Sequence, residues 1–176
     1  MHDKYLIADG KIYILGGRNT YNYFLGDFPG HKNFDRDVLV VCDEPQKDNS
    51  VNQLRNYFET IWQQKDCRYF HNSKKLADRQ SVKKAVLELQ EGYQQYFEVN
   101  KEKICDTDYA DETFETEKIT LLSNPIHTGA KEPVVWYQLG ELMKNAKERV
   151  KIHTPYIICN DMMYNTWEEI AQKVPD

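Results

Sequence analysis

The sequence predicts an α/β fold, because short strand-like runs and amphipathic helical stretches follow one another along the chain. Two strand-like runs meet at an Asp-Gly turn near the start, and a third run rich in valine follows at residues 37–42. Apolar residues then recur at helical spacing in several later stretches. A chain of 176 residues is long enough for one sizeable core or two small ones.

Residues 5–8 and 11–15 are the first two predicted strands, joined by a tight turn at Asp9-Gly10. Side chains alternate along a strand, so His2 and Lys4 are expected to share one face while Asp3 points to the other. Residues 37–42 are predicted to form a buried strand.

A helix is predicted from Ser50, which with Gln53 forms the pattern of a capping box. Its apolar side chains repeat at helical spacing and are expected to form a core face rather than a binding surface. They are Val51, Leu54, Tyr57, Phe58, Ile61 and Trp62.

Residues 66–117 are predicted to be a helical insert followed by an acidic linker. Asp78 or Ser81 would cap the helix, and its apolar stripe is expected to be buried. The stripe comprises Val82, Ala85, Val86, Leu89, Tyr93 and Phe97. The acidic residues 101–117 lack the spacing of an EF-hand, which favours a solvated linker over a calcium site.

Residues 118–176 form a further predicted unit. Residues 119–122 are expected to be a strand, Pro133 to lie in the first turn of a helix, and residues 150–158 to be an interrupted strand. The last predicted helix carries an apolar face of Met163, Trp167, Ile170 and Val174.

The strongest pattern is His2-x-Lys4-x4-Asp9-x6-Gly16-Gly17-x-Asn19. It resembles the HxK(x4)D(x6)GGxN signature of the phospholipase D superfamily, called the HKD motif. Residues 16–24 and 34–40 are also similar to the bacterial cardiolipin synthase-like branch. Several separate spacings agree, which favours a functional origin over a chance hairpin.

The resemblance implies a phospholipase D-like mixed sheet flanked by helices. Residues 1–65 would be the C-terminal part of a first repeat with its HKD motif, and 118–176 the N-terminal part of a second repeat. Residues 66–117 are not matched. The strands of the second part could instead complete the sheet that holds His2, giving one circularly permuted repeat.

The resemblance also implies a role for each catalytic residue. His2 would form a covalent phosphohistidine or act as its acid partner, while Lys4 and Asn19 would hold the phosphate. These residue types suit the reaction, which needs a nucleophile and charge neutralisation on the phosphate oxygens. No cofactor and no metal ion is expected, because Lys and His take the place of a cation.

The supporting residues have less direct roles. Gly16 and Gly17 would let the backbone pass close to the ligand. Asp37, or alternatively Asp35, would orient His2 by accepting a hydrogen bond from its ring, although either could simply face water. Asp9 is expected to shape its turn and to take no part in bond breaking.

The implied activity is phosphodiester hydrolysis or phosphatidyl transfer. Two-repeat members of the family join two HKD motifs at one site, whereas this chain has one, since neither His127 nor His153 precedes a lysine by two residues. The chain is therefore expected to be an incomplete, inactive fragment of such an enzyme. The alternatives are a homodimeric single-motif phosphodiesterase or nuclease, and a non-catalytic scaffold.

The expected substrate is a phospholipid or another phosphodiester, because the resemblance to the cardiolipin synthase-like branch implies a lipid and a net charge of −5 disfavours nucleic acid. No apolar run approaches the ~20 residues of a membrane span. The four scattered cysteines are expected to be reduced, as in a soluble cytoplasmic protein, and a zinc site built from them is disfavoured. The parent enzyme would be associated with the cytoplasmic membrane.

Overall fold

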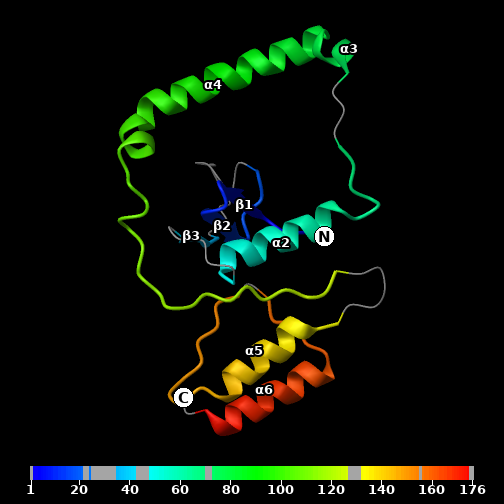
Figure 1. The fold of residues 1–176 in the computed structure, drawn as a ribbon, viewed down its shortest axis with the longest axis vertical. Helices are drawn as coiled ribbons and strands as arrows, with labels where there is room; N and C mark the ends of the chain where they lie inside the picture. Colours follow the sequence, from blue (N-terminus) through cyan, green and yellow to red (C-terminus); the bar gives the residue numbers. More distant parts are fainter. Residues whose placement is uncertain are drawn as a thin grey trace. The chain divides into compact units, whose positions relative to one another are not determined.

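The computed structural model describes residues 2–21, 24, 35–42, 48–69, 73–126, 132–154 and 156–174. The chain divides into two compact units, Met1–Ile119 and Thr120–Asp176, and each is described by itself. Helices combine with one small sheet, as the α/β prediction requires (Figure 1). Within the described ranges the sheet is wholly antiparallel, so the expectation of a mixed sheet is wrong.

The sheet consists of β1 (Tyr5–Ala8), β2 (Ile12–Gly16) and β3 (Asp37–Val41), in the order β1-β2-β3. The predicted turn between the first two strands is confirmed. Asp9 and Gly10 have φ angles of +53° and +66°, and the Lys11 amide donates to the Ala8 carbonyl over 3.1 Å. Aspartate tolerates this left-handed conformation and glycine adopts it freely, so this pair fixes the hairpin.

The third strand lies at the edge of the sheet rather than in its centre. Only Val40 is buried on it, whereas Val38 is 59 % exposed. The prediction of a buried strand is therefore wrong. A run of valines suits a buried strand and an edge strand equally well, and the position in the sheet decides between them.

Helix α2 (Ser50–Trp62) covers one face of the sheet and builds the core of the first unit. Val51 and Leu54 are each 1 % exposed. The Tyr5 ring contacts the rings of Tyr57 and Phe58 edge-on, with centroids 6.2 and 6.5 Å away. The predicted core face is thus confirmed at the N-terminal end of α2, whereas Phe58 and Trp62 are 38 % and 40 % exposed. Fully burying one such aliphatic side chain stabilises the fold by ~1.5–3 kcal/mol.

The N-terminus of α2 is capped one residue earlier than expected. The Asn49 side chain accepts a hydrogen bond from the Asn52 amide at 2.8 Å. The Ser50 hydroxyl points into the core instead, where it accepts a hydrogen bond from the Tyr13 hydroxyl at 3.2 Å. The capping box predicted between Ser50 and Gln53 is therefore wrong, because the hydroxyl of Ser50 bonds to Tyr13 of the sheet and not to the start of the helix.

The predicted helical insert consists of α3 (Lys74–Ala77) and α4 (Gln80–Cys105). Neither Asp78 nor Ser81 caps α4, since Arg79 holds the N-cap position without a side-chain cap bond. No residue of α4 is buried, so the expectation of a buried stripe is also wrong for the isolated chain. Residues 106–119 form turns and extended chain with every residue exposed, as expected of a solvated linker.

The second unit is a pair of helices, α5 (Val134–Lys144) and α6 (Asp161–Lys173). The Trp136 and Trp167 rings meet edge to face with centroids 5.4 Å apart. An ion pair of 2.5 Å joins Lys144 to Glu169. This hydrogen bond raises the pKa of Lys144 and lowers that of Glu169.

The predicted apolar face of α6 is confirmed at its C-terminal end. Ile170 and Val174 are buried in the second unit, as expected. Leu142 on α5 is 69 % exposed. Pro133 lies at the N-cap of α5, one position before the predicted first turn.

The other two predicted strands are wrong. Residues 119–122 and the described part of 150–158 have no strand conformation, and the sheet consists of β1, β2 and β3 within the described ranges. A strand forms where backbone hydrogen bonds pair it with a neighbouring strand, and the described sheet pairs neither segment with β1, β2 or β3. The circularly permuted repeat required both segments in the sheet with His2, so that arrangement is not formed. Among the described residues, no helix is long and apolar enough to cross a membrane.

Candidate functional site

The candidate site begins at the two residues that precede β1. The ammonium of Lys4 lies 3.0 Å from Nδ1 and 3.1 Å from Nε2 of the His2 ring. It also donates to the His2 carbonyl over 3.2 Å. The ammonium donates to whichever ring nitrogen carries the lone pair. The expectation that these two side chains lie on one face is therefore confirmed.

The ladder of the sheet extends to Lys4, because the Gly16 amide donates to the Lys4 carbonyl at 3.2 Å. Gly16 is in turn paired with Asp37 of β3. Lys4, Gly16 and Asp37 thus form one row across the three strands. Residues in such a row share a face, so a lysine and an aspartate stand on either side of a glycine.

The two glycines of the motif make room for two carboxylates. A methyl group on Gly16 would overlap the Asp37 carboxylate, and one on Gly17 would lie 3.1 Å from Oδ1 of Asp35. The sequence suggested that these glycines admit a ligand. The structure shows that they admit the chain's own aspartates.

Arg18 connects these parts, and sequence reasoning did not single it out. Its Nε donates to Oδ2 of Asp37 over 2.7 Å. Its two terminal nitrogens donate to the carbonyls of Phe24 and Asp35 over 2.7 and 2.8 Å. One guanidinium therefore ties the end of β2 to the start of β3, which its five donors make possible. The one feature of the sequence that could have indicated Arg18 is its position inside the Gly-Gly-x-Asn motif.

Asp35 and Asp37 do not contact His2. Within the described part of the chain, the only hydrogen-bond partner of His2 is Lys4. Oδ2 of Asp35 is buried, and it has no hydrogen-bond partner among the described residues. The role of either aspartate in orienting His2 stays a prediction. Asp37 already accepts the hydrogen bond from Arg18.

Asn19 is half-buried directly after this cluster. Its carbonyl accepts from the Tyr21 amide over 2.9 Å. No described residue hydrogen-bonds its side-chain amide. Its donation to a phosphate oxygen, which the motif implies, stays a prediction. Asp9 lies in the hairpin turn, in line with its predicted backbone role.

Asp3 anchors the segment from the opposite face of the sheet. Tyr57 on α2 donates its hydroxyl proton to Oδ2 of Asp3 over 2.8 Å. Burial, followed by this hydrogen bond and the charge of Asp3, raises the pKa of Tyr57 to about 12. Burial and the same charge raise the pKa of Tyr5. This contact holds the short segment that carries His2 and Lys4, and no local sequence pattern indicated it.

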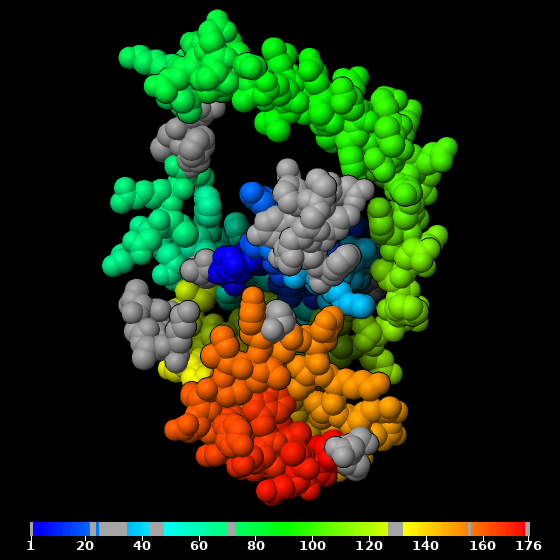
Figure 2. Space-filling view, turned by 180° about the vertical axis from the view of Figure 1, so that it is seen from behind, coloured from blue at the N-terminus to red at the C-terminus, as the bar shows by residue number. Residues whose placement is uncertain are grey.

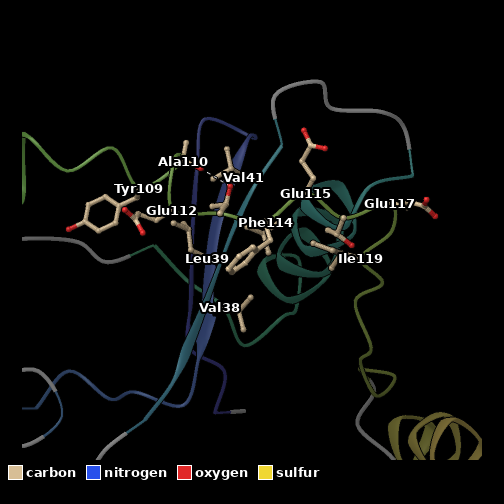
Figure 3. A pocket seen from close by; sticks show the side chains of 13 residues that line it. Val38, Leu39, Val41, Tyr109, Ala110, Glu112, Phe114, Glu115, Glu117 and Ile119 are labelled. Carbon is tan, nitrogen blue, oxygen red and sulfur yellow. Dashed lines mark hydrogen bonds between the residues drawn. The ribbon is translucent and has the colours of Figure 1, made fainter. Parts of the chain in front are cut away.

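An open groove of the first unit lies elsewhere, along the edge strand (Figure 3). It has a volume of about 1120 Å³ and is lined by Val38–Val41 and by residues of the acidic linker between Tyr109 and Ile119. The carboxylates of Glu115 and Glu117 point away from β3 in Figure 3. His2, Lys4 and Asn19 do not line this groove, so it is not part of the candidate site.

Among the other four histidines, only His153 lies within the described residues. His153 is exposed in the second unit, and His127 lies outside the described residues. Over the described ranges, no group of three or more metal-ligating side chains comes together.

Comparison with known proteins found no match to this chain among protein-family models, curated proteins or solved structures. The site is therefore interpreted from its own residues and geometry.

Proposed function

We propose that residues 2–19 form half of a phospholipase D-type active site of the cardiolipin synthase-like kind, which processes phosphodiesters by hydrolysis or phosphatidyl transfer. The observation that carries this proposal is the position of the Lys4 ammonium, within 3.0 and 3.1 Å of the two His2 ring nitrogens. The same face of the sheet is open, since Leu6 and Ile14 on it are 58 % and 41 % exposed.

In this proposal a ring nitrogen of His2 attacks phosphorus. A phosphate oxygen would compete with the ring for the Lys4 ammonium, which frees the lone pair of the nitrogen as the substrate binds. Lys4 and the Asn19 amide would then neutralise charge on the non-bridging oxygens. An N–P bond forms, one P–O bond breaks, and the alkoxide leaves with a proton that another group must supply.

That proton donor is the missing half of the site. The family to which the motif is similar uses a second histidine from a second HKD motif, and this chain has one motif. The proposed half-site therefore favours formation of the covalent intermediate over complete turnover. A phospholipid substrate is proposed over nucleic acid because the net charge of the chain is −5. In this proposal the complete enzyme works at the cytoplasmic membrane.

The test uses bis(p-nitrophenyl) phosphate in EDTA, because p-nitrophenolate is a weak base that leaves without a proton. The proposal predicts a burst of up to one p-nitrophenolate per chain, followed by slow release. The intact protein should gain the mass of the remaining phosphoryl ester, and the adduct should be lost in acid. His2→Ala should abolish both the burst and the adduct.

His153→Ala is the matched control, since it removes an exposed histidine that lacks the lysine partner and should leave the burst unchanged. A rate of turnover that rises with the square of protein concentration would identify the homodimeric phosphodiesterase instead. A well-folded chain that gives neither burst nor adduct would contradict phosphohistidine chemistry and leave the non-catalytic scaffold.

A further inference from the structure

Helix α4 carries an apolar stripe whose central side chains are exposed in the part of the chain that the structure describes. Spacings of four and three residues alternate strictly along it, which is the pattern of a coiled-coil seam. We name these positions the α4 seam: Val82, Val86, Leu89, Tyr93, Tyr96 and Asn100. Leu89, Tyr93 and Tyr96 are 74 %, 65 % and 62 % exposed.

Such a helix needs a partner for its stability. α4 has 26 residues and is ~39 Å long, with no buried residue along its length. Most helical stability in proteins comes from packing an apolar face, so an uncovered seam of this length marks an interaction surface. Side chains stand out along the whole helix in the space-filling view, where α4 is green (Figure 2).

We propose that the α4 seam packs against α4 of a second copy of this chain, antiparallel, with the two-fold axis at Glu91. The seam is symmetric about this residue. Leu89 then faces Tyr93 of the second copy, Val86 faces Tyr96, and Val82 faces Asn100. In an antiparallel coiled coil, the two kinds of core position face each other across the seam. Each layer here therefore combines an aliphatic side chain with a larger or polar one.

The row beside the seam allows the two helices to approach closely. Ala85, Gly92 and Val99 follow one another at seven-residue intervals along one side of it. Apart from its chain neighbours and the nearby backbone of α4 itself, a Cβ atom at Gly92 would meet no described atom within 4 Å. A glycine in mid-helix costs ~1 kcal/mol relative to alanine, and in this arrangement it lies next to the axis, where the two backbones come closest.

Charge selects the antiparallel orientation. Residues 74–84 contain five basic side chains and one acidic side chain, whereas residues 98–108 contain four acidic and two basic ones. The proposed axis places the first segment of one copy opposite the second segment of the other. A parallel pair would instead bring the two basic segments together, which like-charge repulsion disfavours.

The first experiment is sedimentation of the full chain over a range of micromolar concentrations. The wild type should dimerise, and Leu89→Glu should raise the dissociation constant at least ~100-fold, because each dimer would then bury two carboxylates against apolar layers. Leu87→Glu is the matched control. It adds the same charge at a side chain that is 58 % exposed and lies off the seam, and it should change the constant less than ~3-fold.

A distance measurement tests the orientation independently. A spin label on the exposed Cys105, with the other three cysteines replaced by serine, should report roughly 40 Å between copies in the antiparallel dimer. A separation below roughly 20 Å would show a parallel pair and overturn the proposal. A dimer that Leu89→Glu leaves intact would also overturn the proposal. A chain that stays monomeric at every concentration would overturn it too, because the seam would then be covered within the chain or not at all.

Discussion

Helices α2 and α4 carry the same kind of sequence signal, with apolar residues at helical spacing and a polar opposite face. In α2 the stripe is packed against the sheet, and Leu54 is 1 % exposed. In α4 the stripe faces outward, and Leu89 is 74 % exposed. Periodicity therefore predicts that a helix has an apolar face, whereas the partner of that face is set by the rest of the molecule.

Truncating one leucine on each helix should give the largest difference in stability between changes in α2 and changes in α4. Leu54→Ala should lower the free energy of unfolding of the first unit by ~2–5 kcal/mol, because it opens a cavity in a closed core. Leu89→Ala should change the stability of the monomer by less than ~0.5 kcal/mol, because its side chain is already exposed.

Urea unfolding of each variant checks this, at concentrations low enough to keep the chain monomeric. Equal losses from both leucines would show that α4 is packed within the monomer, and the contrast between the two helices would then disappear.

The caps of the two helices give the next largest contrast. Asn49→Ala should cost ~1 kcal/mol, because it removes the acceptor for the Asn52 amide at the start of α2. Arg79→Ser should stabilise α4 by up to ~1 kcal/mol, since it places a cap side chain where there is no cap bond.

Helix content measured by circular dichroism during thermal unfolding reports both changes. A loss of helix in Arg79→Ser would contradict the assignment of the N-cap to residue 79.

A smaller effect concerns the pH dependence of α2 packing. The pKa of Tyr57 is raised from about 10, its value in the unfolded chain, to about 12. Its raised folded-state pKa therefore contributes stability that is fully present below about pH 10 and is lost as the pH rises towards 12. The stability advantage of the wild type over Tyr57→Phe should shrink across this range.

Urea unfolding of the pair at several pH values between 8 and 11 measures this advantage. The difference between their absorbance titrations should also show one phenol that ionises at about pH 12. A constant advantage across the range would mean that the pKa of Tyr57 is not raised in the folded protein.

Part of the candidate site follows from local sequence alone. Alternation along a strand places His2 and Lys4 together, and an Asp-Gly pair predicts the turn that returns the chain to Gly16. The contacts of Arg18 with Asp37 and of Asp3 with Tyr57 join residues 19 and 54 positions apart. Such distant partners leave no periodic signal, so sequence reasoning did not find them.

The sequence by itself determined the hairpin, the helical stretches and the motif with its paired histidine and lysine, because each depends on residues a few positions apart. Only the tertiary structure decided that β3 is an edge strand, that residues 119–122 and the described part of 150–158 do not form strands, and that the centre of the α4 seam is exposed. Each of these depends on what a segment packs against. A strand or an apolar face specifies that it needs a partner, and long-range packing specifies whether the chain supplies one.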